Sequence, residues 1–228
     1  EGFHSSENTT AENAITTVNV PVRAGYTFNG YFVGEEGTST KVVDANGDIV
    51  ASNTLTSAPI EVYAYWTANT NTVRINNTNV EVLSGEATAT SGVAYTATFK
   101  RKTGYDLPNS LSALTIGGED VDADDYSYVV AADGESATLT ISADVVLDDI
   151  VITIVGVAKT PTITLDANGG SISAVEDWTV AEDGKSATKV VTFADAYGIL
   201  PTNDNNSETA GDTLIRAGYI FKGWFAEK

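Results

Sequence analysis

Three oxygen-bearing side chains at alternating positions are the clearest candidate for metal chemistry. Asp44, Asn46 and Asp48 have the spacing with which a calcium loop begins, and carboxylate and amide oxygens are ligands that Ca²⁺ prefers. The bidentate glutamate that ends an EF-hand loop is missing. We therefore interpret the segment first as a β-turn and second as a calcium site, and we expect no other cofactor.

Aromatic rings are the second candidate for binding chemistry, because an exposed ring can stack on the face of a sugar. The chain has three tryptophans, Trp66, Trp178 and Trp224. Trp66 and Trp224 fall in the motifs described below, where core packing is the expected role. Trp178 lies outside those motifs, so it is the better candidate for a surface ring and for a ligand-binding residue.

The residues that most catalytic sites require are scarce. Cysteine is absent, and His4 is the single histidine. The 31 aspartates and glutamates are so numerous that a pair of them is uninformative, because a glycosidase needs two carboxylates at a defined separation in a cleft. We predict a protein that is not an enzyme and has no catalytic residues.

The net charge of the chain limits the classes of molecule that it can bind. Twelve basic residues against 31 acidic ones leave a formal net charge of -19, which repels nucleic acid and anionic membrane surfaces. No apolar run is long enough to span a bilayer, so we expect no membrane insertion within this segment. The expected partner is an unidentified protein or glycan on a host or neighbouring cell.

A ten-residue motif occurs twice. Residues 23–32 align with residues 216–225 at an offset of 193, with seven identical positions, and we call the two copies the N-terminal hook and the C-terminal hook. In the first copy Tyr26 and Phe28 alternate with polar residues, which predicts a strand with its rings on one face. Gly25 indicates a turn into this strand. Gly30 indicates a bulge or a close backbone approach.

The hook resembles the signature of the Listeria-Bacteroides repeat, the B-repeat of internalin-type surface proteins. In that family a strand ending in Asp-x-Asn-Gly-Gly opens the module, and a strand similar to Val-Tyr-Ala-x-Trp closes it. Residues 162–170 resemble the opening strand of the second copy, and residues 61–66 the closing strand of the first. The motif residues that this resemblance identifies are Arg23, Gly25, Tyr26, Phe28, Gly30, Tyr31, Phe32, Tyr63, Trp66, Arg216, Gly218, Tyr219, Phe221, Gly223, Trp224 and Phe225.

The resemblance implies a small β-grasp-like fold and a place in surface-exposed proteins. Each copy shows only one end of the module, so we expect that both are partial and that the chain was cut from a longer array. The alternative is that the chain ends of neighbouring molecules complete one another.

The segment between the hooks alternates like strands throughout, for example at residues 95–99, 137–141 and 149–154. We predict a sandwich of six or seven strands there. Asp133-Gly134 and Asp183-Gly184 lie in similar sequences at an offset of 50, and each predicts a hairpin with a type I′ turn.

The predicted fold class is all-β, with small β-grasp-like repeat modules flanking a sandwich-like middle domain. The predicted domains are a partial module at 1–68, an all-β spacer at 69–158 and a second partial module at 159–228. The predicted function is that of a non-enzymatic stalk or adhesion segment of a secreted bacterial protein, located outside the cell on its surface or wall. The alternative is a carbohydrate-binding module of a secreted glycan-degrading enzyme, which would leave an aromatic platform exposed.

Overall fold

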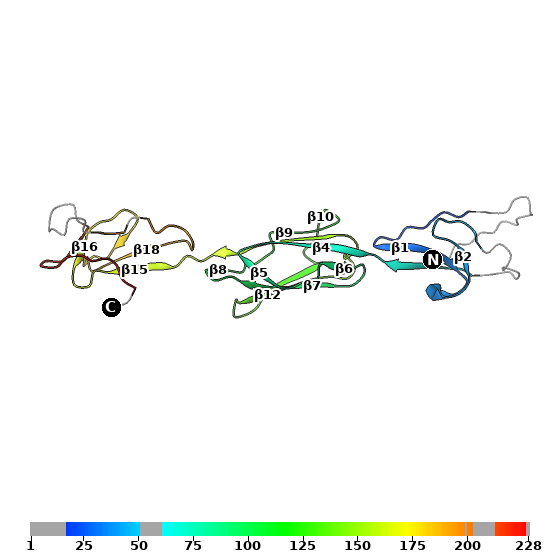
Figure 1. Cartoon of the computed structure of the whole chain (residues 1–228), viewed down its shortest axis with the longest axis horizontal. Coiled ribbons are helices and arrows are strands. Elements are labelled where there is room, and N and C mark those ends of the chain that lie inside the picture. Colours follow the sequence, from blue (N-terminus) through cyan, green and yellow to red (C-terminus); the bar gives the residue numbers. More distant parts are fainter. Residues whose placement is uncertain (1–16, 51–60, 199, 203–212, 227–228) are drawn as a thin grey trace, which may run out of the picture. The chain divides into compact units, whose positions relative to one another are not determined.

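The computed structural model describes residues 17–50, 61–198, 200–202 and 213–226 (Figure 1). Nearly all of the regular structure there is strand, with one short 3-10 helix, η1 (Glu35–Gly37). The predicted all-β class is confirmed. Among these residues no helix is long and apolar enough to cross a membrane.

The chain forms two compact units, which are described separately. The first consists of Glu1–Arg101 with Leu107–Val155, and the second of Lys102–Asp106 with Gly156–Lys228. The first unit contains both the N-terminal hook and the middle segment. The C-terminal hook belongs to the second.

The N-terminal hook lies in a three-stranded antiparallel sheet with the order β2-β1-β3. The central strand β1 (Tyr26–Phe32) carries the hook, and Phe28 and Phe32 on one of its faces are buried. The closing strand predicted from residues 61–66 is β3 (Tyr63–Ala68), and β2 (Lys41–Val43) covers the other edge. Alternation along the hook therefore predicted the buried face correctly.

The middle segment is a sandwich of two sheets. One is four-stranded and antiparallel, in the order β11-β12-β7-β5, and the other has the order β10-β9-β13-β4-β6 with one parallel pair, β13 and β4. Their strands are β4 (Thr70–Thr78), β5 (Val80–Ser84), β6 (Thr88–Thr90), β7 (Tyr95–Arg101), β9 (Ala113–Ile116), β10 (Glu119–Asp120), β11 (Tyr126–Val130), β12 (Ser136–Ile141) and β13 (Ile150–Val155).

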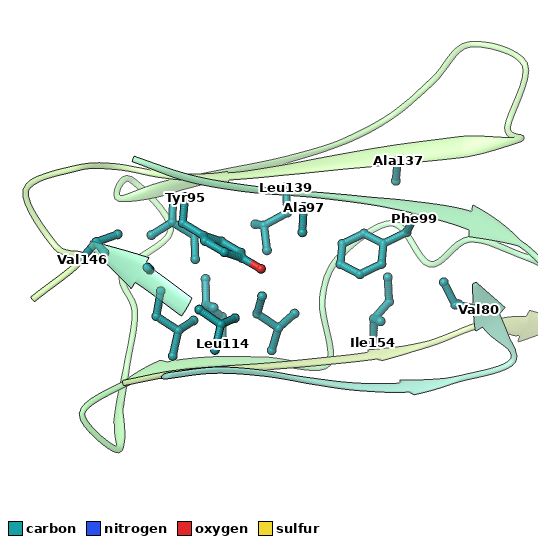
Figure 2. Close-up of a cluster of buried hydrophobic side chains, with 14 of the residues drawn as sticks. Val80, Tyr95, Ala97, Phe99, Leu114, Ala137, Leu139, Val146 and Ile154 are labelled. Atoms are coloured by element: carbon teal, nitrogen blue, oxygen red, sulfur yellow. The ribbon is translucent and has the colours of Figure 1, made fainter. Parts of the chain in front are cut away.

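The sandwich core lies between these two sheets. Figure 2 shows Ala97, Phe99 and Leu139 on one layer, facing Leu114 and Ile154 on the other. All five are at most 5% exposed. The inward positions of β7 and β12 alternate with exposed or half-buried ones, as expected of strands with one buried face.

The three strands that alternation predicted here are present as β7, β12 and β13. The sandwich contains nine strands in its fully described sequence, more than the predicted six or seven. The additional strands include β6 and β10, which are only three and two residues long. Such short strands carry too few positions for a period of two to be detected.

The described residues of the second unit form three small sheets of short strands. The largest has the order β15-β18-β17, and the opening strand predicted from residues 162–170 is present as β15. The strands of this unit are β8 (Tyr105–Asp106), β14 (Val157–Ala158), β15 (Thr162–Asp166), β16 (Ser171–Ile172), β17 (Thr179–Val180), β18 (Ser186–Val190) and β19 (Leu214–Ile215).

Both predicted Asp-Gly hairpins are present, but the predicted type I′ turn is wrong. Gly134 has a φ of +70° and donates its amide hydrogen bond to Ala131 at 2.9 Å, whereas Asp133 has no positive φ. A type I′ turn needs two such residues. The Asp133 carboxylate accepts the amide of Glu135 at 2.9 Å, which holds the aspartate in the turn.

The second hairpin has the same hydrogen bonds. Gly184 donates to Ala181 at 2.9 Å, and the Asp183 carboxylate accepts the amide of Lys185 at 2.9 Å. Shared turn chemistry is sufficient to explain the similarity of the two sequences.

Candidate functional site

The N-terminal hook begins with a tight turn, across which the Arg23 guanidinium packs on the Tyr26 ring. The amide of Tyr26 donates to the carbonyl of Arg23 at 3.1 Å, and Gly25 between them has a φ of +76°. The guanidinium carbon of Arg23 lies 3.8 Å from the centre of the Tyr26 ring, which is cation–π distance. The predicted turn at Gly25 is confirmed.

The middle of this hook contains a bulge. The register between β1 and β3 shifts between Phe28 and Gly30, and Gly30 has a φ of +125°. A Cβ atom placed on Gly30 would lie 2.2 Å from the carbonyl oxygen of Val43. Both features predicted for this glycine, a bulge and a close backbone approach, are therefore present.

The rings of this hook pack against the rings of β3. Phe28 lies 5.3 Å from Trp66, and Phe32 lies 5.8 Å from Tyr65, measured between ring centres. Phe28 and Phe32 are each 6% exposed. The aromatic residues of the N-terminal hook thus form a small core, as predicted, and β3 covers it.

A hydrogen bond orients Tyr63 at the start of β3. Its hydroxyl donates to the Glu61 carboxylate at 2.8 Å. This bond, followed by the negative charge of Glu61, raises the pKa of Tyr63 above its usual value. The phenol therefore keeps its proton and its bond throughout the physiological range.

The C-terminal hook repeats this local geometry. Arg216 lies 3.8 Å from the Tyr219 ring centre, and the Tyr219 amide donates to the Arg216 carbonyl at 3.1 Å. Gly218 and Gly223 have φ values of +74° and +123°, within two degrees of their counterparts. Phe221 and Trp224 form a T-shaped pair at 5.6 Å, as Phe28 and Tyr31 do at 5.2 Å in the first copy.

The two hooks differ in what covers them. Among the described residues of the second unit, no strand pairs with residues 219–225, and these residues are not assigned to a strand. Phe225 is 77% exposed, whereas its counterpart Phe32 is 6% exposed. Tyr219 is also exposed, at 63%. Phe221 and Trp224 of the second copy are half-buried, so the exposed rings of this hook are Tyr219 and Phe225.

A groove of about 450 Å³ lies beside the C-terminal hook. One wall is formed by residues 164–168, from β15 and the turn after it, and the other by residues 219–226. Leu165 and Leu214 at its base are buried, and Phe221 and Trp224 pack against the same hydrophobic cluster. The groove therefore lies between β15 and the hook, and its lining mixes apolar side chains with polar and charged ones such as Asp166, Arg216 and Lys222.

The candidate calcium ligands Asp44, Asn46 and Asp48 lie in a turn, which is the interpretation that we placed first from the sequence. The Asp44 carboxylate accepts the backbone amides of Asn46 and Asp48, each at 2.9 Å. The backbone of Asp44 also bonds to Asp48 and Gly47. Across the described residues, no three histidine, aspartate or glutamate side chains gather to form a metal site.

Trp178, the candidate for a surface ring, is buried. It is 7% exposed and belongs to a buried cluster with Leu165, Ile172, Ala187 and other residues of the second unit. Its burial depends on how the segment before β17 folds back onto β15 and β18, and local sequence does not show this.

A junction that the sequence analysis missed lies within the first unit. Asn69 is the single residue between β3 and β4, and its amide donates to the Gly25 carbonyl at 2.9 Å. Its carbonyl accepts the amide of Ser91 at 2.9 Å, and its side chain accepts the Thr27 hydroxyl at 2.7 Å. A Cβ atom on Gly92 would lie 2.2 Å from the Tyr26 hydroxyl.

The junction therefore joins the N-terminal hook directly to the sandwich. The sequence signal for it was weak, because a lone asparagine between two strand patterns resembles any loop residue.

Comparisons with known proteins gave one match. No curated protein and no solved structure matches the chain. The family model of the Listeria-Bacteroides repeat domain matches residues 1–58, which include the N-terminal hook. The resemblance inferred from the hook is confirmed for residues 1–58, which are similar to a repeat domain found in bacterial surface proteins.

Proposed function

We propose that this chain is a non-enzymatic spacer and adhesion segment of a secreted bacterial surface protein. The repeat family is typical of extracellular bacterial surface proteins, which supports a location on the cell surface or wall. The distinctive residues of the hooks have structural roles, in turns, bulges and small aromatic cores. The role of the chain is then to hold and present other parts of the protein.

The observation that carries this proposal is the junction at Asn69. Its backbone bonds to Gly25 on one side and to Ser91 on the other, so one residue connects two modules without a free linker. Short, hydrogen-bonded connections limit motion between neighbouring modules, as a spacer requires, whereas a flexible linker would let them move independently.

The carbohydrate-binding alternative is less well supported. It requires an exposed aromatic platform, and the tryptophan proposed for that role, Trp178, is buried. Trp66 and Trp224 are half-buried in or beside the hooks. The described tryptophans therefore do not form such a platform.

The spacer role is tested by measuring whether the first unit tumbles as one body. We expect ¹⁵N relaxation to give the same correlation time for amides of β1 and β3 as for amides of β7 and β12. A matched variant with a flexible Gly-Ser insertion after Asn69 should separate the two values. Two different correlation times in the unmodified chain would contradict the proposal.

The adhesive role is tested by a binding screen of the purified chain. Glycans and host extracellular-matrix proteins are presented with calcium and with chelator. Saturable binding to a matrix protein or cell-surface glycan would support adhesion by the modules themselves. If no binding is detected in the screen and thermal unfolding is cooperative, the chain acts as a spacer without adhesive activity.

A further inference from the structure

The first and last strands of the sandwich are hydrogen-bonded neighbours. β4 begins the sandwich and β13 ends it, and the two lie side by side at the centre of the five-stranded sheet. Their pairing is parallel, from Ile150 opposite Val73 to Val155 opposite Thr78. The chain therefore enters and leaves the sandwich at opposite ends of this pair.

This arrangement decides how the pair responds to tension along the chain. Tension draws β4 toward its first residue, Thr70, and β13 toward its last residue, Val155. Because the strands are parallel, these two pulls act in opposite directions along a common axis. The hydrogen bonds of a parallel pair are evenly spaced, so sliding loads all of them together and none breaks without its neighbours.

The pair is buried, and a side chain extends it at its start. Ile150, Ile152 and Ile154 of β13 are 0% exposed, and β9 and β6 cover the two outer edges of the pair. The backbone amide of Thr72 donates to the Asp149 carboxylate at 2.6 Å, one position before the first paired residues. Backbone hydrogen bonds within a packed core open less readily than exposed ones.

The N-terminal module has the opposite geometry. Its strand β1 begins at Tyr26 and its strand β3 ends at Ala68, and these two residues are partners in an antiparallel pair. Tension between them acts on two ends that lie side by side, so the strands separate one residue pair at a time. Within the first unit, the parallel pair is therefore the feature that resists tension.

We propose that the sandwich is a load-bearing domain, in which β4 and β13 form a mechanical clamp that keeps it folded under tension along the chain. Staying folded under load is a further function, beyond holding parts of a protein apart. The clamp is a property of the sandwich itself, whereas the source of the tension rests on the proposed function as a surface segment.

Single-molecule force spectroscopy of the full chain tests the clamp by changing the direction of pulling. The chain has no cysteine, so introduced thiols are its attachment points. Thr70→Cys with Val155→Cys makes the two strands slide past each other, whereas Thr78→Cys with Val155→Cys peels apart two paired residues. All three positions are exposed. Each released residue adds about 3.6 Å of length, so the length gain identifies unfolding of the sandwich.

We expect the unfolding force in the sliding direction to be several times that in the peeling direction. Forced unfolding is governed by the barrier to unfolding, and only sliding requires several hydrogen bonds to break together. Equal forces at the same pulling speed, or a higher force on peeling, would overturn the clamp. Neither the relaxation measurement nor the binding screen applies force, so the proposed function stands or fails separately.

Asp149 provides a second test in the same two directions. Asp149→Ala removes the acceptor of the Thr72 amide and should lower the force on sliding. It should leave the force on peeling unchanged, because peeling opens the pair from its other end. Asp149→Asn is the matched control, which keeps a side-chain oxygen and should retain the sliding force. Equal losses of force in both directions would overturn the assignment of Asp149 to the clamp.

Discussion

Gly30 lies so close to Val43 that a side chain at this position would collide with the neighbouring backbone. A Cβ atom built on Gly30 is 2.2 Å from the Val43 carbonyl oxygen, and the φ of Gly30 is +125°. The same dihedral occurs at Gly223, where the nearest atom to a Cβ is a ring carbon of Phe225 at 4.0 Å. The two glycines thus separate the effect of backbone strain from that of a close approach.

We expect Gly30→Ala to destabilise the N-terminal module by more than Gly223→Ala destabilises the second unit. Strain at such a dihedral costs about 1–3 kcal/mol, and only Gly30 adds the collision. Hydrogen exchange of β1 and β3 amides measures the destabilisation by Gly30→Ala. Exchange of β15 and β18 amides measures the destabilisation by Gly223→Ala. Equal destabilisation by the two variants would show that the collision with the Val43 carbonyl is relieved at no cost in free energy.

Two tyrosines of the sandwich whose hydroxyl groups differ in hydrogen bonding should respond differently to loss of the hydroxyl. The Tyr95 hydroxyl donates to the Glu86 carbonyl at 2.9 Å, whereas the buried Tyr128 hydroxyl has no hydrogen-bond partner among the described residues. Tyr95→Phe should lower the free energy of unfolding by about 1 kcal/mol, and Tyr128→Phe should leave it unchanged or raise it. Urea unfolding of the two variants provides the test, and a larger loss in Tyr128→Phe would refute the assignment.

Stability of the sandwich should fall at alkaline pH. Burial raises the pKa of Tyr128, and burial followed by the charge of Glu86 raises the pKa of Tyr95. Because the unfolded chain then ionises first, the stabilisation by these phenols is complete below about pH 10 and is lost as pH rises through their folded-state pKa values. Urea unfolding at several pH values should show this decline, with a smaller slope in a Tyr95→Phe, Tyr128→Phe double variant.

Trp178→Ala should destabilise the second unit rather than remove a surface contact. Trp178 is 7% exposed within the cluster that contains Leu165 and Ala187, and deleting such a ring costs about 3–5 kcal/mol. We expect faster hydrogen exchange in β15 and β18, with β7 and β12 unaffected. The exposed Tyr197→Ala change is the control, and unchanged exchange in Trp178→Ala would mean that the ring is not part of the core.

The local geometry of the hooks was predictable from sequence. A glycine after Arg-Ala indicates the turn, and a glycine four residues after the tyrosine indicates the bulge. The φ angles of these two glycines agree within two degrees between the copies. The contacts that determine this geometry join residues three apart in the chain, such as Arg23 with Tyr26, so the ten residues of the motif contain the information.

What covers the N-terminal hook was decided only by tertiary structure. Phe32 is 6% exposed and Phe225 is 77% exposed, although both end the same motif. A strand needs a neighbour to satisfy its backbone hydrogen bonds, and the neighbour of the N-terminal hook is β3, more than thirty residues away. Trp178 shows the same dependence, since the residues that bury it come from several strands of the second unit, and no local pattern shows that they meet.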